Sequence, residues 1–598
     1  MKRSFLFVLL ALISMVGAAS EAKESWIRIN QLGYLPNDVK VAVIISTGNA
    51  RGDFKVFDNA TGKLVLKGKG RKADASKWAL ASAWRLDFSK VTAPGQYYIV
   101  CDGVKSPLIH IDAHCYDGLA DRLLEYMRQQ RCGDNPLTDK PCHQHDGYII
   151  YHPTKSGAYI DVRGGWHDAN DRLQYVTTTA TSIYHMAFAY KYTKDKSIFK
   201  DEYNARGREG SNGIPDIIDE IMWGLDWLDR MNPAPGEYYY QLGDDRDHTG
   251  SEAKVDYGYG PGQGRPVYFV TGEPQVADKR IGKVNRTTGV SSAAGKFAST
   301  FALGADVLAP FYPEFSAKIA AKVEPAYRFA LEKPGNTQTA CVVSPYFYEE
   351  DTWVDDIELA AATMYAQNGQ EYWKKQASYW GELEPVSPWM EKGRGPGKEY
   401  HHYQWYPFIN LGHFLLASSD DADLKAEFGG YMRAGLEDMR TRAGEDPFLH
   451  GIPYLWCSNN LTSAAITHAQ LYRRATGDES FLEMETANRD WLLGCNPWGS
   501  TMISGFPEKL EEGYHSPTQC SAAFRNVAGG LVDGPIYTAL FLDRIGVHLT
   551  REDPFATFNK GVAVYHDDRG DYSSNEPTID GTASLFYYFA AMEEAGHR

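Results

Sequence analysis

The chain has 598 residues, of which 43% are hydrophobic and 23% are charged. This is ordinary globular composition, and the length predicts two or more domains, because one hydrophobic core rarely serves so many residues. The formal net charge of −16 argues against a nucleic-acid partner, since proteins that bind nucleic acids normally carry a basic surface. Eight cysteines are too few to staple a chain of this length, so large cores must hold the fold.

The first 22 residues have the pattern of a signal peptide. Lys2 and Arg3 precede a short apolar stretch over residues 4–15, and small residues follow it. This stretch is shorter than the roughly 20 residues that a membrane-spanning helix needs. We therefore expect a protein without a membrane span, exported to the periplasm or the extracellular space.

Short β-rich segments fill residues 23–112. The segments 39–45 and 96–100 are rich in β-branched and aromatic residues, and turn signals such as 36–38 and 94–95 lie between such segments. About seven strands of this kind in some 90 residues predict a small immunoglobulin-like β-sandwich.

From residue 113 to residue 598 the hydrophobic pattern is helical. Apolar residues fall on one face over residues 119–127 and again over 217–228, where Pro215 opens the segment. With ten further stretches this makes about twelve helices, which predicts a mainly α domain, an (α/α)6 barrel whose loops form a cleft at one end. The long connection 233–290 is rich in Gly, Tyr and Asp and is expected to form a wall of that cleft. The further stretches lie near 172–193, 292–309, 314–333, 354–369, 371–381, 408–418, 422–442, 460–476, 478–494 and 577–595.

Two segments carry carboxylates suited to hydrolysis of a glycosidic bond. Asp168 and Asp171 lie in the run GGWHDAND, and Glu576 ends the run DDRGDYSSNE; each run precedes a predicted helix. Glycoside hydrolysis needs one protonated and one ionised carboxyl group, and two Asp residues in a tight loop can hold one water. The alternative interpretation is that these residues only cap helices.

The motifs and their order resemble glycoside hydrolase family 9, in the subgroup with an N-terminal immunoglobulin-like module. The run GGWHDAND with Tyr175 after it resembles the family signature GGWxDAGDxxKY, and residues 565–583 resemble its second signature. Residues 26–36, 212–227 and 493–504 resemble further elements of the family, so that the resemblance covers essentially the whole mature chain. It implies a secreted endo-β-1,4-glucanase that inverts the anomeric centre.

The resemblance also implies roles for the three carboxylates. Asp171 corresponds to the general base, Asp168 to the residue that orients the attacking water, and Glu576 to the general acid. We expect Glu576 in the first turn of the last helix, whose positive end favours an ionised carboxylate. Burial and the charges of Asp168 and Asp171 would have to oppose that effect to keep the acid protonated.

The chain departs from the family pattern near these residues. Asn170 replaces a Gly in DAGD, and Asn is the side chain that best tolerates the positive φ expected there. Pro517 and Thr582 stand where Arg and Asn are usual, so the sugar contacts near them are expected to differ. Aromatic residues beside the carboxylates could bind sugar rings or belong to the core. The predicted substrate-binding residues are Trp166, Tyr514 and Tyr572, together with His515, which the resemblance places near the family's active-site histidine and which would hydrogen-bond the sugar.

Cys132, Cys142, His143 and His167 form a second constellation. Two thiolates and two imidazoles make a complete tetrahedral zinc set with no open position. The alternative is a Cys132–Cys142 disulfide with two ordinary histidines. The same arrangement occurs in the family members with an immunoglobulin-like module, and His167 directly precedes Asp168, so we predict a structural zinc ion that holds the catalytic loop.

A calcium site is a weaker hypothesis. Asp351, Asp355 and Asp356 lie where some relatives bind Ca²⁺ through oxygen ligands. Their position at the start of a predicted helix explains their charge equally well.

Three functions remain open at this point. The first is endo-acting hydrolysis of cellulose, mixed-linkage glucan or xyloglucan by a monomer whose partner is the polysaccharide. The second is exo-acting hydrolysis on the same scaffold, if a loop such as 233–290 blocks the cleft. The third is glycan binding without catalysis, although binding alone would need none of the three carboxylates.

Overall fold

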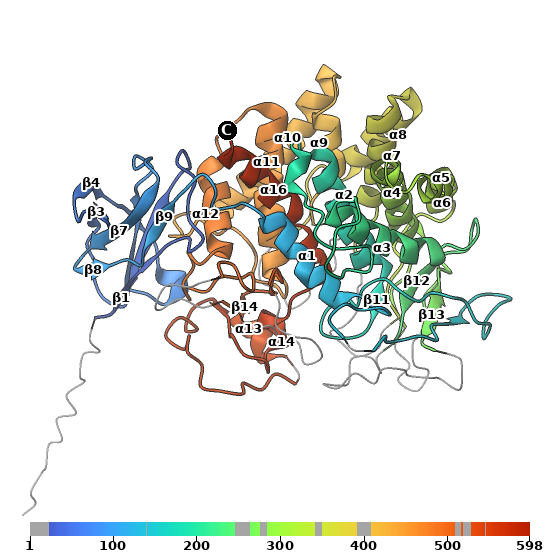
Figure 1. Cartoon of the computed structure of the whole chain (residues 1–598), viewed down its shortest axis with the longest axis horizontal. Helices are drawn as coiled ribbons and strands as arrows, with labels where there is room; N and C mark the ends of the chain where they lie inside the picture. The colour runs from blue at the N-terminus through green and yellow to red at the C-terminus, as the bar shows by residue number, and fades with distance from the viewer. Residues whose placement is uncertain are drawn as a thin grey trace, which may run out of the picture.

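The computed structural model describes residues 23–138, 140–244, 264–275, 284–340, 350–391, 408–508, 516–517, 528–544 and 546–598. Figure 1 shows two parts, a β-sandwich built by the N-terminal residues and a larger helical body. Within the described ranges, no helix has both the length and the apolar character needed to cross a bilayer.

The N-terminal part consists of two antiparallel sheets around one core. Exposed and buried residues alternate in β3 (Asp53–Asp58), with Phe54 and Val56 inside, as expected where one face of a strand covers a core. Both side chains pack with Ile44 and Ile99 in a cluster between the sheets, which confirms the predicted sandwich. The first sheet has the order β1 (Ser25–Arg28), β2 (Val41–Ser46), β6 (Ser82–Asp87), β5 (Arg71–Ala73), and the second β4 (Leu64–Lys69), β3 (Asp53–Asp58), β7 (Gly95–Cys101), β8 (Val104–Lys105), with β9 (Ile109–Ile111) also on β7.

The helical body is a closed double ring. Each member of the inner ring contacts the next, and the last contacts the first, while the outer helices pack around them. This confirms the predicted (α/α)6 barrel. The inner ring is α2 (Val176–Tyr192), α4 (Ser291–Leu308), α7 (Val354–Asn368), α9 (Leu411–Ala417), α11 (Ser458–Thr476) and the pair α15 (Ile579–Ala583) and α16 (Phe586–Gly596). The outer ring is α1 (Leu119–Gln130), α3 (Asp216–Arg230), α5 (Pro313–Ala320) with α6 (Val323–Glu332), α8 (Glu371–Leu383), α10 (Ala422–Ala443) and α12 (Leu482–Leu492).

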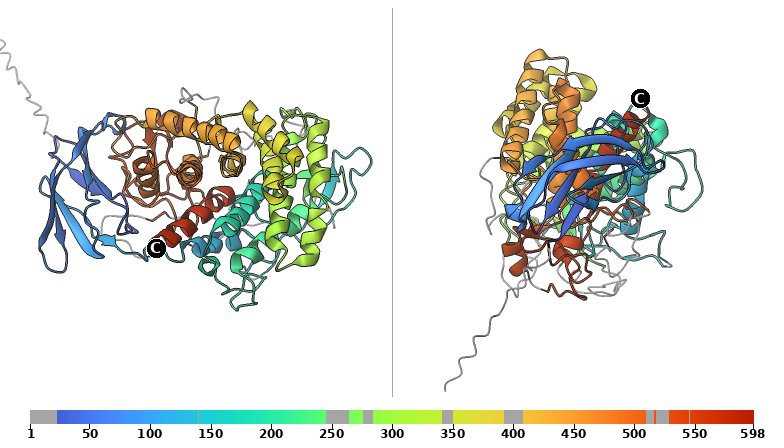
Figure 2. Two further views of the ribbon diagram at one scale, coloured as in Figure 1. Left: turned by 90° about the horizontal axis from the view of Figure 1, so that it is seen from above. Right: turned by 90° about the vertical axis from the view of Figure 1, so that its left-hand side faces the viewer.

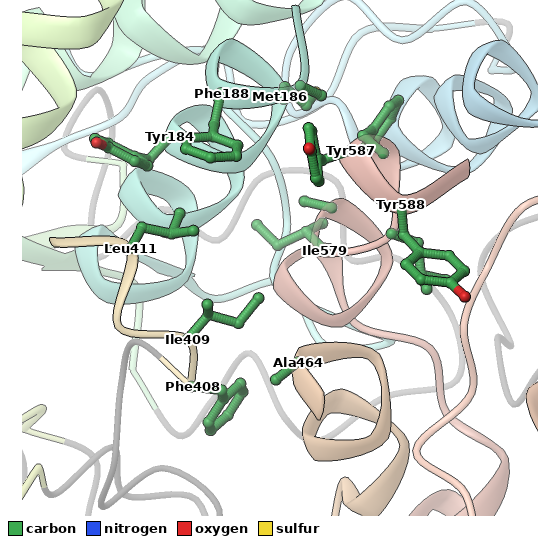
Figure 3. Packing of buried hydrophobic residues seen from close by; sticks show 14 of the residues in the cluster. Tyr184, Met186, Phe188, Phe408, Ile409, Leu411, Ala464, Ile579, Tyr587 and Tyr588 are labelled. Atoms are coloured by element: carbon green, nitrogen blue, oxygen red, sulfur yellow. The ribbon is translucent and has the colours of Figure 1, made fainter. Parts of the chain in front are cut away.

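The helices of the two rings differ in how deeply they are buried. Helix α4 is buried along nearly its whole length, whereas α8 buries only Trp373, Ala377 and Gly381. Small residues let the inner helices approach closely, since a Cβ on Gly295 of α4 would lie 2.9 Å from the main-chain carbonyl carbon of Asp356 in α7. Figure 3 shows side chains from α2, α9, α11, α15 and α16 converging in this core.

Two predicted helices are each split in two. The stretch 314–333 forms α5 and α6, and Pro325 in the first turn of α6 has no N–H to continue the bonding of α5. The stretch 577–595 forms α15 and α16, separated by Ser584 and Leu585.

Short strands also lie in the connections, where we expected none. One mixed sheet has the order β10 (Tyr148–Ile150), β13 (Pro266–Phe269), β12 (Tyr239–Leu242), β11 (Gln174–Tyr175), and β14 (Ile536–Tyr537) pairs with β15 (Ala563–Val564). Strands β12 and β13 belong to the connection 233–290, of which residues 245–263 and 276–283 lie outside the described residues.

The sandwich packs against one side of the barrel (Figure 2). The side-chain amide of Asn30 donates to Asp490 Oδ1 of α12 at 2.8 Å, and the ring of Trp78 lies 5.7 Å from that of Trp491. Polar and aromatic contacts thus join the two parts, and the domain boundary after residue 112 stays a prediction.

Candidate active site and metal centre

The predicted carboxylates lie at one end of the barrel, where inner helices begin. The loop with Asp168 and Asp171 precedes α2, and Glu576 precedes α15. Figure 1 shows β11 and α14 (Tyr572–Asn575), which flank these residues in the chain, at the same lower end of the barrel.

Two hydrogen bonds join these distant segments. Oε1 of Glu576 accepts from the N–H of Asn170 at 2.8 Å, and the N–H of Ile579 donates to the carbonyl of Asp168 at 3.1 Å. Asp168 is 2% exposed, while Asp171 and Glu576 are half-buried. The structure therefore brings the three predicted carboxylates into one site.

The backbone of the loop differs from the expectation in one respect. Positive φ values occur at Gly164 and Gly165, and Asn170 is not among the residues with positive φ. The expected reason for tolerating Asn170 is therefore wrong. A Cβ on Gly165 would lie 2.7 Å from the ring of Trp227, so the close approach at this position requires Gly.

Trp166 is buried in the core, which does not fit the predicted substrate contact. Its side chain is 0% exposed, and its indole N–H donates to Oε1 of Glu220 at 2.8 Å. The ring packs over Gly224 of α3, where an added Cβ would meet it at 2.2 Å. Trp166 is thus a core residue that holds the loop against the outer ring.

We expected Glu576 in the first turn of the last helix, but it does not lie there. It follows α14 in an extended conformation with φ −89° and ψ 127°, and Thr578 caps the next helix. The helix dipole therefore does not favour its ionised form. Burial, followed by the charges of Asp533 and Asp171, raises the pKa of Glu576 well above its ordinary value.

Asp533 is a site residue that the sequence did not reveal. It is 1% exposed, and its N–H donates to the carbonyl of Glu576 at 2.8 Å. Its carboxylate accepts from the indole N–H of Trp456 at 2.6 Å and from the thiol of Cys457 at 2.9 Å. A lone Asp in a loop has no local pattern that would have marked it.

Of the other predicted sugar contacts, only Tyr572 can be placed. It is half-buried at the start of α14, with its ring 5.6 Å from that of Trp456. Its role as a substrate contact stays a prediction. Tyr514 and His515 lie outside the described residues.

The four predicted zinc ligands form one buried group. Sγ of Cys132 lies 3.9 Å from Sγ of Cys142 and 3.6 Å from Nδ1 of His143, and Sγ of Cys142 lies 3.8 Å from Nε2 of His167. All four ligand atoms lie within 4.8 Å of one another. A sulfur–sulfur bond would be about 2.05 Å long, so the cysteines are free thiols, and the disulfide alternative is wrong.

These distances fit a tetrahedral zinc ion. Sulfur at about 2.3 Å and nitrogen at about 2.0–2.1 Å from such an ion would lie about 3.8 Å apart for S–S and about 3.5 Å apart for S–N. Burial lowers the pKa of His167 to about 4, so the imidazole is neutral at neutral pH, as a metal ligand must be.

The group is bonded directly to the loop that carries the carboxylates. The N–H of Cys132 donates to the carbonyl of Gly165 at 2.8 Å, and the N–H of His167 donates to the carbonyl of Gln130, the last residue of α1, also at 2.8 Å. The side chain of Gln130 returns a bond of 2.6 Å to the carbonyl of Ala169. Hydrogen bonds therefore connect the predicted zinc ligands directly to the loop of Asp168 and Asp171.

The proposed calcium ligands have other partners. Asp351 pairs with Arg286 at 3.1 Å, and Asp355 accepts from Thr352 at 2.7 Å. The three carboxylates do not converge as a metal-binding group within the described part of the chain. Calcium binding here stays a prediction.

A buried ammonium group lies beside the third of these carboxylates. Nζ of Lys296 contacts Asp356 at 2.7 Å and Glu350 at 2.5 Å. The chain thus places a cation of its own in this acidic cluster.

Comparisons with known proteins identify the family of the chain. A family model described as glycosyl hydrolase family 9 matches residues 116–589, and one described as cellulase N-terminal ig-like domain matches residues 22–106. A xyloglucan-specific endo-beta-1,4-glucanase of Bacteroides ovatus is 25% identical, over 95% of this chain and 93% of its own. A cellodextrinase of Butyrivibrio fibrisolvens is 24% identical, over 95% and 99%.

The fold is also similar to that of solved structures. The solved structure described as a Zn-binding triple mutant of the family 9 endoglucanase J30 superposes with a TM-score of 0.70 at 22% identity, covering 93% of this chain and 99% of its own. Because the family model spans most of the chain, the protein is a glycoside hydrolase and belongs to glycosyl hydrolase family 9.

Proposed function

We propose that this enzyme cleaves β-1,4-glucan backbones by inversion, with Glu576 as general acid, Asp171 as general base and Asp168 orienting the water. The observation that carries this proposal is the hydrogen bond of 2.8 Å between Oε1 of Glu576 and the N–H of Asn170. It holds a carboxyl of raised pKa next to the residue that precedes Asp171.

The chemistry follows from the protonation states. The protonated carboxyl of Glu576 donates its proton to the glycosidic oxygen as the bond to the anomeric carbon breaks. Asp171 removes a proton from a water that attacks the anomeric carbon from the opposite face. An inverting pair holds its carboxyls roughly 6.5–9.5 Å apart to leave room for that water, and we propose such a separation here.

Among substrates, we propose β-1,4-glucans such as xyloglucan, cleaved by endo action. The xyloglucan-specific relative aligns over almost its full length, which supports xyloglucan as the first substrate to test. The cellodextrinase relative aligns over 99% of its length and supports exo action on short chains as the second candidate.

A product profile separates the two candidates. Tamarind xyloglucan, barley glucan and carboxymethylcellulose are each digested briefly, and the products are sized. Mixed oligomers at early times support endo action. A single small product from the outset supports exo action, and no product from any glucan would contradict both.

We further propose that Cys132, Cys142, His143 and His167 hold a structural zinc ion. With four protein ligands, such an ion has no open position for water. Its contribution is to fix the end of α1 to the loop of Asp168 and Asp171.

Export is also a proposal, resting on the signal pattern of residues 1–22. N-terminal sequencing of the mature protein and fractionation of producing cells test it. A mature chain that still begins at Met1 in the cytoplasm would contradict it.

A further inference from the structure

Asp533 lies where its charge would act on the acid. Its backbone N–H is bonded to the carbonyl of Glu576 at 2.8 Å, so the two residues are fixed side by side. Both carboxyls lie in surroundings that disfavour ionisation, and two neighbouring carboxyls of this kind cannot readily both carry a charge. One of the pair must therefore hold a proton.

The hydrogen bonds decide which of the two holds it. The carboxylate of Asp533 accepts on both oxygens, from the indole N–H of Trp456 on Oδ2 at 2.6 Å and from the thiol of Cys457 on Oδ1 at 2.9 Å. For Glu576 the structure gives one donor, the N–H of Asn170 on Oε1. Because donors stabilise the ionised form, the negative charge is better placed on Asp533.

We propose that Asp533 is a positioning residue, which carries the buried negative charge of this pair and thereby leaves the proton on Glu576. The inference rests on the proposed role of Glu576 as the general acid. A charge on Asp533 adds to the effect of burial, which by itself already favours the protonated acid.

Other charged groups also act on Glu576 and Asp533. Asp168 and Asp171 also raise the pKa of Glu576, and Asp571 and Asp580 raise that of Asp533. Among the described residues, Cys457 and the buried phenol of Tyr126 also interact with both members of the pair. Among the charges that act on Glu576, that of Asp533 has the largest effect.

The test is the pH dependence of kcat/KM in Asp533→Asn, measured on the soluble glucan that the wild-type enzyme degrades best. Asn has the shape of Asp without the charge, so the pKa of Glu576 should fall. The alkaline limb of the profile should then move to lower pH by one unit or more. Asp533→Ser, which is also neutral but smaller, is measured in parallel and should shift in the same direction, so that the test survives if one variant fails to fold.

The matched control is Asp446→Asn. Asp446 is buried at the contact with the sandwich, and its Oδ2 also accepts from an indole N–H, that of Trp78 at 3.2 Å. Its profile should keep the wild-type limb, because this carboxylate pairs with Lys77 and Trp78 and is not among the charges that act most strongly on Glu576.

Two outcomes overturn the inference. An alkaline limb that stays in place in both Asp533 variants, with activity lowered equally at all pH values, would reduce Asp533 to a structural residue. A limb that moves to higher pH would mean that the charge is on Glu576. Either result leaves the proposed function intact as long as Glu576→Gln is inactive, whereas an active Glu576→Gln would reject the proposed function itself.

Discussion

Oε1 of Glu576 accepts a hydrogen bond of 2.8 Å from the N–H of Asn170, the residue directly before Asp171. The two residues are 406 positions apart in the chain, and this bond holds the proposed acid against the loop of the proposed base. A disturbance of the loop should therefore move both of the proposed catalytic groups.

Glu576→Gln and Asp171→Asn should each lower kcat on an unactivated glucan by about 100- to 10,000-fold, the range that general acid–base catalysis contributes. Asp168→Asn should be severe but less complete, because Asp168 orients the water without receiving its proton. Initial rates of reducing-end release measure this. The exposed Glu371, changed to Gln, serves as the control and should keep wild-type rates. Substantial activity of Glu576→Gln would reject the acid assignment.

The same Glu576→Gln variant should be more stable than the wild-type enzyme at high pH. Burial raises the pKa of Glu576, so the folded state binds this proton more tightly than the unfolded chain. The wild-type free energy of unfolding then falls as pH rises above the ordinary carboxyl value, by at most about 1.4 kcal/mol per pH unit. Gln cannot ionise and avoids this loss.

Urea unfolding of both proteins between pH 5 and pH 9 measures the difference. The stability advantage of the variant should grow with pH. An advantage that is constant with pH, or that shrinks, would contradict the raised pKa.

Much of the architecture could be predicted because its signals are local. The period of apolar residues located the helices, and runs of β-branched and aromatic residues, such as 39–45 and 96–100, located the strands. The predicted helix boundaries were inaccurate where a helix is buried on every side. Helix α2 is buried nearly throughout, so its sequence has little polar face to mark its start at Val176.

The site was predictable in part. Asp168, Asp171 and Glu576 lie in motifs with a recognisable order, and the structure brings them together. Asp533 has no such motif, and only tertiary folding places it against Glu576. Trp166 was assigned wrongly because a neighbour in sequence can point into the core, as its bond to Glu220 shows.

The zinc group gives a third prediction. Purified protein should contain about one zinc per chain, and removing the ion with a chelator should lower both the midpoint of thermal unfolding and the activity, because the loop of Asp168 and Asp171 loses its anchor. Cys142→Ser should have the same effects.

The matched control is Cys101→Ser, at a buried thiol of the sandwich. It should retain the metal and the activity. Metal analysis of all three proteins decides the matter. Absence of metal in wild-type protein purified without chelators, with full activity, would contradict the site.

A fourth prediction concerns the buried ion cluster of Lys296, Glu350 and Asp356. Lys296→Met keeps the length of the side chain but leaves two buried carboxylates without their cation, which should cost about 3–5 kcal/mol of folding free energy. Lys318→Met removes a largely exposed partner of Asp229 and should cost about 1 kcal/mol or less. Urea unfolding measures both, and equal losses would contradict the role of Lys296.

The stereochemistry of the product tests the central claim most directly. A β-1,4-glucan oligomer is hydrolysed in an NMR tube, and the anomeric protons of the new reducing end are followed before mutarotation. Attack of a water activated by Asp171, opposite a leaving group protonated by Glu576, predicts that the α-anomer appears first and the β-anomer only later. A first product in the β configuration would require a covalent intermediate and would contradict this account.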